Sequence, residues 1–217
     1  MSYTLIVGTK EWSSWSLRPY MALRHIGVAF KEDVIPLRQH TTSTEVQKRS
    51  RSGRVPILEI EEKGTHYAVW DSLAICETLA DRHPEGKLLP DDPKARALAR
   101  AYSAEMHAGF ADVREQLTME FARTLPTPAL RDATKAQIER IKSAWTDALT
   151  EYGANGGFLF GRFSIADCMY APVVSRFRTY GIALSPQLQA YSDRVWALPA
   201  MADWGKASKA EVDAGLA

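Results

Sequence analysis

The spacing of apolar residues changes near residue 84, and this change restricts the fold more than any other feature of the chain. Before it, short apolar runs typical of strands alternate with segments of helical spacing. After it, apolar residues recur every three or four positions and no run is typical of a strand. The sequence therefore predicts an α/β domain over residues 1–83, a linker over 84–92 and an all-helical domain over 93–217.

The α/β part predicts the order strand, helix, strand, helix, strand, strand, helix. The strands are expected at residues 3–8, 29–37, 55–60 and 66–70. The three helices are expected to begin at Trp15 or Ser16, at Ser43 or Thr44, and at Asp71 or Ser72. A β-α-β unit followed by a hairpin and a closing helix predicts a mixed sheet with helices packed against it.

The second half predicts two long amphipathic helices and two shorter ones. Apolar residues at helical spacing run from Leu98 to Phe121 and again from Ile138 to Tyr152. Shorter helical stretches are expected at residues 164–178 and 186–197. We therefore expect a helical bundle after the linker.

Composition excludes several kinds of partner. A chain of 217 residues with 46% hydrophobic content can bury a sizeable core, so a soluble globular protein is expected. The net charge is only +1, which gives no general attraction to nucleic acid or to a membrane surface. Cys76 and Cys168 stand far apart and no segment has membrane-spanning length, which favours a reducing, cytoplasmic location.

Common catalytic motifs are absent from the sequence. There is no P-loop, no G-x-G-x-x-G, no G-x-S-x-G and no H-E-x-x-H. The five histidines show no ligand spacing with each other or with the cysteines. Nucleotide and metal chemistry are therefore not expected.

The stretch "EWSSWSLRPY" (11–20) places three serines between a predicted strand and a predicted helix. Serine hydroxyls at such a position commonly cap the helix. The alternative is that one hydroxyl faces a ligand at the helix start, where partial positive charge gathers. The residues alone leave both interpretations open.

Four features in order make the chain similar to a known family. They are the serine cluster, "GRVPIL" (53–58), "WDSLAI" (70–75) and "GRFSIADCMYAPV" (161–173). Together they resemble the cytosolic glutathione transferases, in which a thioredoxin-like N-terminal domain precedes an all-α domain. The S-S-x-S-x-R pattern of Ser13 to Arg18 is similar to that of the zeta class, which includes maleylacetoacetate isomerases and usually has cysteine where this chain has Trp15.

This resemblance implies that glutathione is the co-substrate, with no metal. The main chain of Val55, before a cis Pro56, would pair with the cysteinyl part of glutathione. Asp71 would accept from the γ-glutamyl ammonium, while Ser72 and the helix start would bind the adjacent carboxylate. The resemblance also allows His40 to reach the glycyl carboxylate.

The resemblance further implies that a serine hydroxyl stabilises the glutathione thiolate. Ser13 is the position that matches the family's catalytic serine, Ser14 is the second candidate, and Ser16 is expected to cap the helix. Pro19 is expected among the first helical positions, whose N–H groups are free in any case. Arg18 is expected to be structural and to bridge the two domains.

The remaining site residues are aromatic or belong to a cap. An apolar cleft for the electrophile would use Trp12, Trp15, His107 and Phe110, although aromatic residues at helical spacing also form cores. Ser164 and Asp167 look like the family's buried capping box, a structural element rather than a catalytic one.

Three activities fit this interpretation. The first is a glutathione transferase acting on a small hydrophobic electrophile. The second is a glutathione-dependent cis-trans isomerase of a conjugated diacid, which needs cationic groups for the carboxylates. The third is a non-catalytic glutathione-binding protein.

A homodimer is expected as well. The family supplies this expectation, and the first long helix carries an apolar stripe with small residues nearby that would permit close approach of a partner, although a stripe of this kind can belong to the core instead. The stripe is Tyr102, Met106 and Phe110, and the small residues are Ala104, Ala108 and Gly109.

Overall fold

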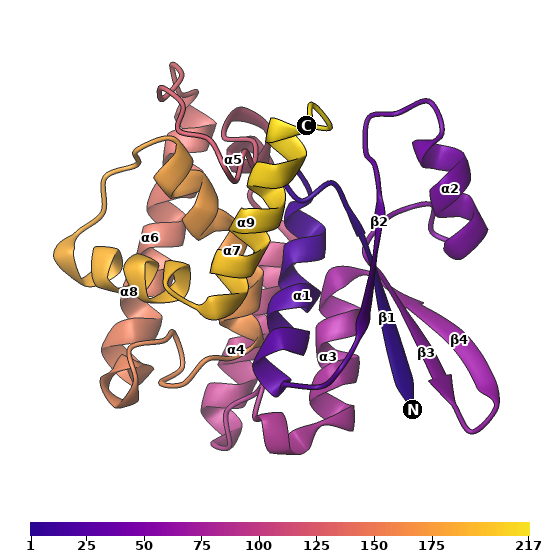
Figure 1. The fold of residues 1–217 in the computed structure, drawn as a ribbon. Helices are drawn as coiled ribbons and strands as arrows, with labels where there is room; N and C mark the ends of the chain where they lie inside the picture. The colour runs from indigo at the N-terminus through magenta and orange to yellow at the C-terminus, as the bar shows by residue number, and fades with distance from the viewer.

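The computed structural model describes residues 1–217, and its first half is a four-stranded mixed sheet with helices (Figure 1). The elements are β1 (Ser2–Gly8), α1 (Ser14–Ile26), β2 (Lys31–Ile35), α2 (Thr42–Arg49), β3 (Ile57–Glu62), β4 (Thr65–Trp70) and α3 (Ser72–Arg82). The strand order is β2-β1-β3-β4, with β1 parallel to β2 and β3 antiparallel to both of its neighbours. The predicted mixed sheet is therefore confirmed.

The rest of the chain is helical, as predicted. Its elements are the 3-10 helix η1 (Pro84–Gly86), α4 (Pro93–Ala108), α5 (Ala111–Gln116), α6 (Asp132–Tyr152), the 3-10 helix η2 (Gly153–Asn155), α7 (Ile165–Thr179), α8 (Pro186–Trp196) and α9 (Pro199–Asp213). None of these helices combines the length and the apolar composition needed to cross a membrane. The chain thus has the thioredoxin-like and all-α architecture expected from the sequence.

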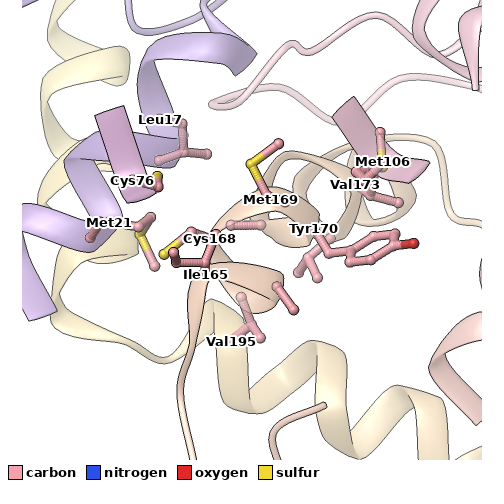
Figure 2. Close-up of a cluster of buried hydrophobic side chains, with 14 of the residues drawn as sticks. Leu17, Met21, Cys76, Met106, Ile165, Cys168, Met169, Tyr170, Val173 and Val195 are labelled. Carbon is pink, nitrogen blue, oxygen red and sulfur yellow. The ribbon is translucent and has the colours of Figure 1, made fainter. Parts of the chain in front are cut away.

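Helix α7 is the centre of the core that joins the two halves. Every residue of α7 except Arg178 is buried, as expected for a helix that is largely apolar on all sides. Helices α1 and α3 pack on it from the N-terminal half, and α4 and α8 pack on it from the C-terminal half. Figure 2 shows Met21 of α1 and Cys76 of α3 beside Cys168 of α7. The two halves therefore share one hydrophobic core.

The helix predicted from Leu98 to Phe121 is interrupted, so this prediction is wrong in its extent. Helix α4 ends at Ala108, Phe110 takes a left-handed backbone with φ of +59°, and α5 ends at Gln116. Phe110, Val113 and Leu117 nevertheless stay buried. Because the break preserves the apolar spacing, periodicity alone does not reveal it.

The apolar stripe of α4 faces the inside of the chain. Met106 is 1% exposed and Phe110 is 6% exposed, and both belong to the shared core. Tyr102 packs edge-on against Phe160, with ring centroids 5.6 Å apart. Of the two alternatives for this stripe, Met106 and Phe110 therefore belong to the core, and the homodimer stays a prediction.

Two further differences concern helix boundaries. Helix α2 begins at Thr42 with Thr41 at its N-cap, one or two residues before the expected start. Helix α9 is not among the predicted elements. Few of its residues are buried, chiefly Met201 and Trp204, so its apolar stripe is too narrow to stand out in the sequence.

Candidate functional site

A cavity of about 210 Å³ lies where α1, β4, α3 and the end of α4 meet the loop before β3. Four of its lining residues are the predicted glutathione-binding residues Val55, Pro56, Asp71 and Ser72. Two are residues predicted for the electrophile, Trp15 and His107, and the others are Ser52, Arg54 and Trp70. The fold thus brings together residues that are far apart in the sequence.

Val55 and Pro56 supply a stretch of main chain to this cavity. The Val55–Pro56 peptide bond is cis, as predicted. Strand pairing of β3 with β4 starts at Ile57, opposite Trp70. The backbone polar groups of Val55 therefore lie outside the ladder, beside the cavity.

Asp71 combines three interactions in one carboxylate. Its Oδ1 accepts from the backbone N–H groups of Leu73 (2.9 Å) and Ala74 (3.2 Å), which makes it the N-cap of α3. Its Oδ2 lies 3.1 Å from Nε2 of His107, at the end of α4. Asp71 has φ of +75°, a backbone conformation that costs an L-residue on the order of 1–3 kcal/mol. The cap and the His107 contact hold this carboxylate at the cavity.

Ser72 is contacted by a guanidinium from inside the protein. Arg18 Nη1 donates a hydrogen bond of 3.5 Å to Ser72 Oγ, and the Arg18 side chain makes no other. Arg18 is 1% exposed and its Nε has no partner. Arg18 and Ser72 both belong to the first half of the chain, so the expectation that Arg18 bridges the two halves stays a prediction.

Helix α1 begins within the serine cluster, one or two residues earlier than expected. Ser13 occupies the N-cap position and α1 starts at Ser14, so the expectation that Ser16 caps the helix is wrong. Pro19 is consequently the sixth residue of α1 and not one of the first four. Because proline lacks an N–H, the carbonyl of Trp15 receives no helical hydrogen bond.

The three serine hydroxyls have different partners. Ser13 Oγ donates to Ser16 Oγ at 2.7 Å, and Ser16 Oγ also accepts from the N–H of Gly8 at 3.2 Å. Ser14 Oγ accepts from Arg176 Nη2 of α7 at 3.1 Å. Neither Ser13 nor Ser14 is among the side chains that line the cavity, although the adjacent Trp15 is. Their catalytic roles stay predictions.

Three arginines surround the start of α1. The guanidinium carbons of Arg18 and Arg114 lie 4.1 and 5.3 Å from the ring centroid of Trp15, and Arg176 contacts Ser14. None of the three lies within ion-pair distance of a carboxylate. The pKa of Arg18 is lowered to about 9, mainly by burial and to a smaller extent by repulsion from Arg114 and Arg176. Burial, followed by repulsion from Arg114, lowers the pKa of Arg176 to about 10.

Sequence reasoning did not single out Arg114 and Arg176. One signal was present, because Arg176 interrupts the apolar run "YAPVVSRF" of a helix that is otherwise buried. A charged residue in such a run is either paired or functional. The position of Arg114 depends on the break between α4 and α5, which the sequence pattern does not show.

Besides Ser13 and Ser14, three residues predicted to contact glutathione or the electrophile lie outside the cavity lining. His40 is exposed on the loop before α2. Trp12 is half-buried and covered by the guanidinium of Arg38, whose carbon is 4.0 Å from the ring centroid. Phe110 is packed in the core. Their proposed contacts with glutathione or an electrophile stay predictions.

Ser164 and Asp167 form a capping box at the start of α7. Asp167 Oδ2 accepts from the N–H of Ser164 (2.8 Å) and from its hydroxyl (3.0 Å). Asp167 Oδ1 accepts from the N–H of Leu159 (3.2 Å) and the hydroxyl of Tyr191 (3.1 Å). Complete burial raises the pKa of Asp167 to about 6, and these hydrogen bonds oppose the rise.

A second cavity of about 570 Å³ lies between α7, α8 and the loop after Phe121, and it contains none of the predicted site residues. Its two arginines, Arg123 and Arg178, are paired with acidic side chains. No group of three or more His, Cys, Asp or Glu side chains is arranged to hold a metal ion. Of these two cavities, it is therefore the one at Val55 and Asp71 that is lined by predicted site residues.

Two family models match the chain. One describes the N-terminal domain of glutathione S-transferases and matches residues 12–82, and the other describes the C-terminal domain of the same family and matches residues 128–197. The first contains the cavity residues from α1, the loop before β3 and α3. The second contains α7 with Arg176 and the capping box.

Individual proteins show the same similarity. A probable maleylacetoacetate isomerase from Caenorhabditis elegans is 24% identical over 174 residues, which cover 80% of this chain and 78% of that protein. A crystallised maleylacetoacetate isomerase from Anaeromyxobacter dehalogenans, with glutathione in its active site, is 26% identical, with a TM-score of 0.68 and coverage of 94% and 95%. Another structure of that isomerase holds dicarboxyethyl glutathione and citrate in the active site.

A glutathione transferase homologue from Burkholderia, solved with bound glutathione, shows the similarity of the fold. It superposes with a TM-score of 0.73 at 24% identity, over 97% of this chain and 100% of that chain.

Proposed function

Since the chain belongs to the glutathione S-transferase family and carries zeta-like features, we propose that its cavity binds glutathione and uses the thiolate to attack a small hydrophobic electrophile. The observation that carries this proposal is the meeting of Val55, Asp71 and Ser72 with Trp15 around one cavity. The main chain of Val55, the carboxylate of Asp71 and the helix start at Ser72 suit the backbone amide, the ammonium and the carboxylate of glutathione, respectively.

Each wall of the cavity suits one part of glutathione. The backbone of Val55 lies outside the sheet ladder and is free to pair with the cysteinyl backbone, as an added strand would. The hydroxyl of Ser72 and the N-terminus of α3 attract the γ-glutamyl carboxylate. The carboxylate of Asp71 attracts the ammonium, in exchange for its contact with His107.

A serine at the start of α1 would lower the pKa of the bound thiol. A free thiol titrates near 8.5, and a hydroxyl donor together with a helix N-terminus favours the thiolate. One hydrogen bond to a charged group contributes roughly 1.5–3 kcal/mol, enough for a shift of about one to two pKa units. We assign this task to the pair Ser13 and Ser14. The rings of Trp15 and His107 offer an aromatic wall to the electrophile.

The arginines favour a second candidate, the glutathione-dependent isomerase of a conjugated diacid. Such a substrate needs cations, and Arg18 and Arg114 lie against Trp15 at the wall of the cavity without carboxylate partners. Guanidinium groups bind carboxylates with two parallel hydrogen bonds, which suits this class of substrate. The similarity to two maleylacetoacetate isomerases supports the same candidate.

Turnover assays separate the candidates. The wild-type protein is assayed with glutathione and a panel of halonitroaromatics, epoxides, peroxides and maleylacetoacetate. Conjugation of aromatic or epoxide substrates supports the transferase, and turnover of maleylacetoacetate supports the isomerase. Glutathione binding without any turnover would leave the non-catalytic binding protein.

We also propose a homodimer, with the domain boundary in residues 84–92. Trp70 supports a partner near the cavity, because its large apolar side chain is 41% exposed at the edge strand β4. Stable dimer interfaces commonly bury on the order of 2,000 Å² and survive dilution. Sedimentation at micromolar concentration is expected to give one species of twice the chain mass, and a single monomeric species would contradict the dimer.

A further inference from the structure

The hydroxyl hydrogens at the start of α1 are not equally available. A serine hydroxyl has one hydrogen to donate. Ser13 uses its hydrogen on Ser16 Oγ, inside a buried chain that also includes the N–H of Gly8. Ser14 Oγ accepts from Arg176, and its own hydrogen is donated to no group of the protein. Of the two candidate serines, Ser13 and Ser14, it is therefore Ser14 that has a free donor.

Arg176 is held rigidly where it contacts Ser14. Its Nη1 donates to the carbonyl oxygens of Arg114 (3.2 Å) and Leu117 at the end of α5, while Nη2 donates to Ser14 Oγ (3.1 Å). The residue is 5% exposed. A buried guanidinium fixed at three points has one orientation, so it fixes Ser14 Oγ as an acceptor.

We propose that Arg176 positions the hydroxyl of Ser14 so that Ser14 donates its hydrogen to the glutathione thiolate. The inference rests on the proposed function, in which a serine of this pair stabilises the thiolate. The guanidinium occupies a lone pair of Ser14 Oγ and leaves the hydroxyl hydrogen for the ligand. Accepting a charge-assisted hydrogen bond also polarises the hydroxyl and makes it a stronger donor.

The surrounding charges act in the same direction. Arg18 of α1 and Arg114 of α5 face the same helix start, with Trp15 between them and the cavity. The carboxylate that lines the cavity, Asp71, is paired with His107. A negative sulfur beside Ser14 would therefore meet mainly positive groups, and its charge would reduce the repulsion among the arginines.

The test is the pKa of the bound glutathione thiol, measured from the ultraviolet absorbance of the thiolate against pH. It is applied to the wild type, Ser14→Ala, Arg176→Met and Arg176→Lys, with glutathione affinity measured by calorimetry. Arg176→Met is expected to raise the thiol pKa by about one unit, a roughly tenfold loss of thiolate. Ser14→Ala is expected to raise it at least as much, and Arg176→Lys to raise it less than Arg176→Met.

Arg178→Met is the matched control, since it removes an arginine two positions along α7 that pairs with Asp193 at the surface. It is expected to leave the thiol pKa at the wild-type value. Ser14→Ala removes one hydroxyl only, so it keeps the test decisive if Arg176→Met does not fold.

The outcomes separate this inference from the proposed function. Variants at Arg176 and Ser14 that bind glutathione with the wild-type thiol pKa would overturn the inference alone. A thiol pKa that rises more in Ser13→Ala than in Ser14→Ala would also overturn the inference. A wild-type protein that does not bind glutathione would overturn the proposed function and, with it, this inference.

Discussion

Two aspartates stabilise helix starts in opposite surroundings: Asp167 is the third residue of α7, and Asp71 is the N-cap of α3. Asp167 at α7 is fully buried, and four hydrogen-bond donors saturate its two oxygens. Asp71 at α3 is 43% exposed in its side chain, opens on the cavity and shares one oxygen with His107. An aspartate at a helix start thus serves stability when all its hydrogen bonds are made inside the protein, and suits ligand binding when one of them can be exchanged for a ligand.

The largest effect is expected from Asp167→Ala. The substitution leaves the N–H groups of Leu159 and Ser164 and the hydroxyl of Tyr191 buried without an acceptor. At roughly 1–3 kcal/mol for each buried unpaired group, partly relieved by relaxation, the free energy of unfolding falls by about 3–5 kcal/mol. Urea unfolding measures it. Native stability with lost glutathione affinity would reverse the roles assigned to the two aspartates.

The second-largest effect is expected in the pH dependence of stability, through titration of the buried Asp167. Burial raises the folded-state pKa of Asp167 to about 6, above its ordinary value of 3.8, so the folded protein binds the proton more tightly. The contribution of Asp167 to stability is therefore fully present below the ordinary value and is lost as the pH rises through about 6. The loss amounts to about 1–3 kcal/mol.

Comparison with Asp167→Asn isolates this effect, because asparagine does not titrate. Between pH 4 and pH 7 the unfolding free energy of the wild type is expected to fall relative to that of the variant. A wild type that gains stability relative to the variant over this range would show that the carboxylate is stabilised by its hydrogen bonds more than it is destabilised by burial.

Asp71→Asn is expected to weaken glutathione binding by roughly tenfold, the value of one charge-assisted hydrogen bond of about 1.5 kcal/mol. Stability is expected to change by less than about 0.5 kcal/mol, because asparagine is an equally good N-cap and tolerates a positive φ. Calorimetric titration and thermal unfolding check the two parts. Unchanged affinity would remove Asp71 from the binding site.

His107→Ala is expected to give the smallest effect. The partly exposed contact between His107 and Asp71 is worth about 0–1 kcal/mol, so its loss changes glutathione affinity by at most about fivefold. The direction is informative, since tighter binding means that His107 competes with the ligand ammonium. A loss of affinity as large as that of Asp71→Asn would instead make His107 a direct ligand-binding residue.

The site could be predicted from sequence where local chemistry decides it. Val-Pro before a strand and Asp-Ser before a helix are local signals, and Val55, Pro56, Asp71 and Ser72 all line the cavity. The order of strands and helices followed from apolar spacing in the same way. The domain boundary drawn at residues 84–92 stays a prediction.

The rest depends on tertiary contacts that one sequence does not display. The turn at Phe110 keeps the apolar spacing of a continuous helix while it redirects the chain. Arg114 and Arg176 reach the start of α1 only because α5 and α7 are packed there, and the partners of the serines follow from that packing. Sequence therefore indicated which segment carries the hydroxyls, but not which hydroxyl has a free hydrogen.

The central claim is that the cavity binds glutathione as its thiolate. Calorimetric titration of the wild type at neutral pH, in buffers of different ionisation enthalpy, measures the protons released on binding. A thiol pKa shifted below neutrality predicts a release approaching roughly one proton per glutathione, and none with S-methylglutathione, which lacks the thiol. Binding of glutathione without proton release, or the absence of binding, would contradict the account.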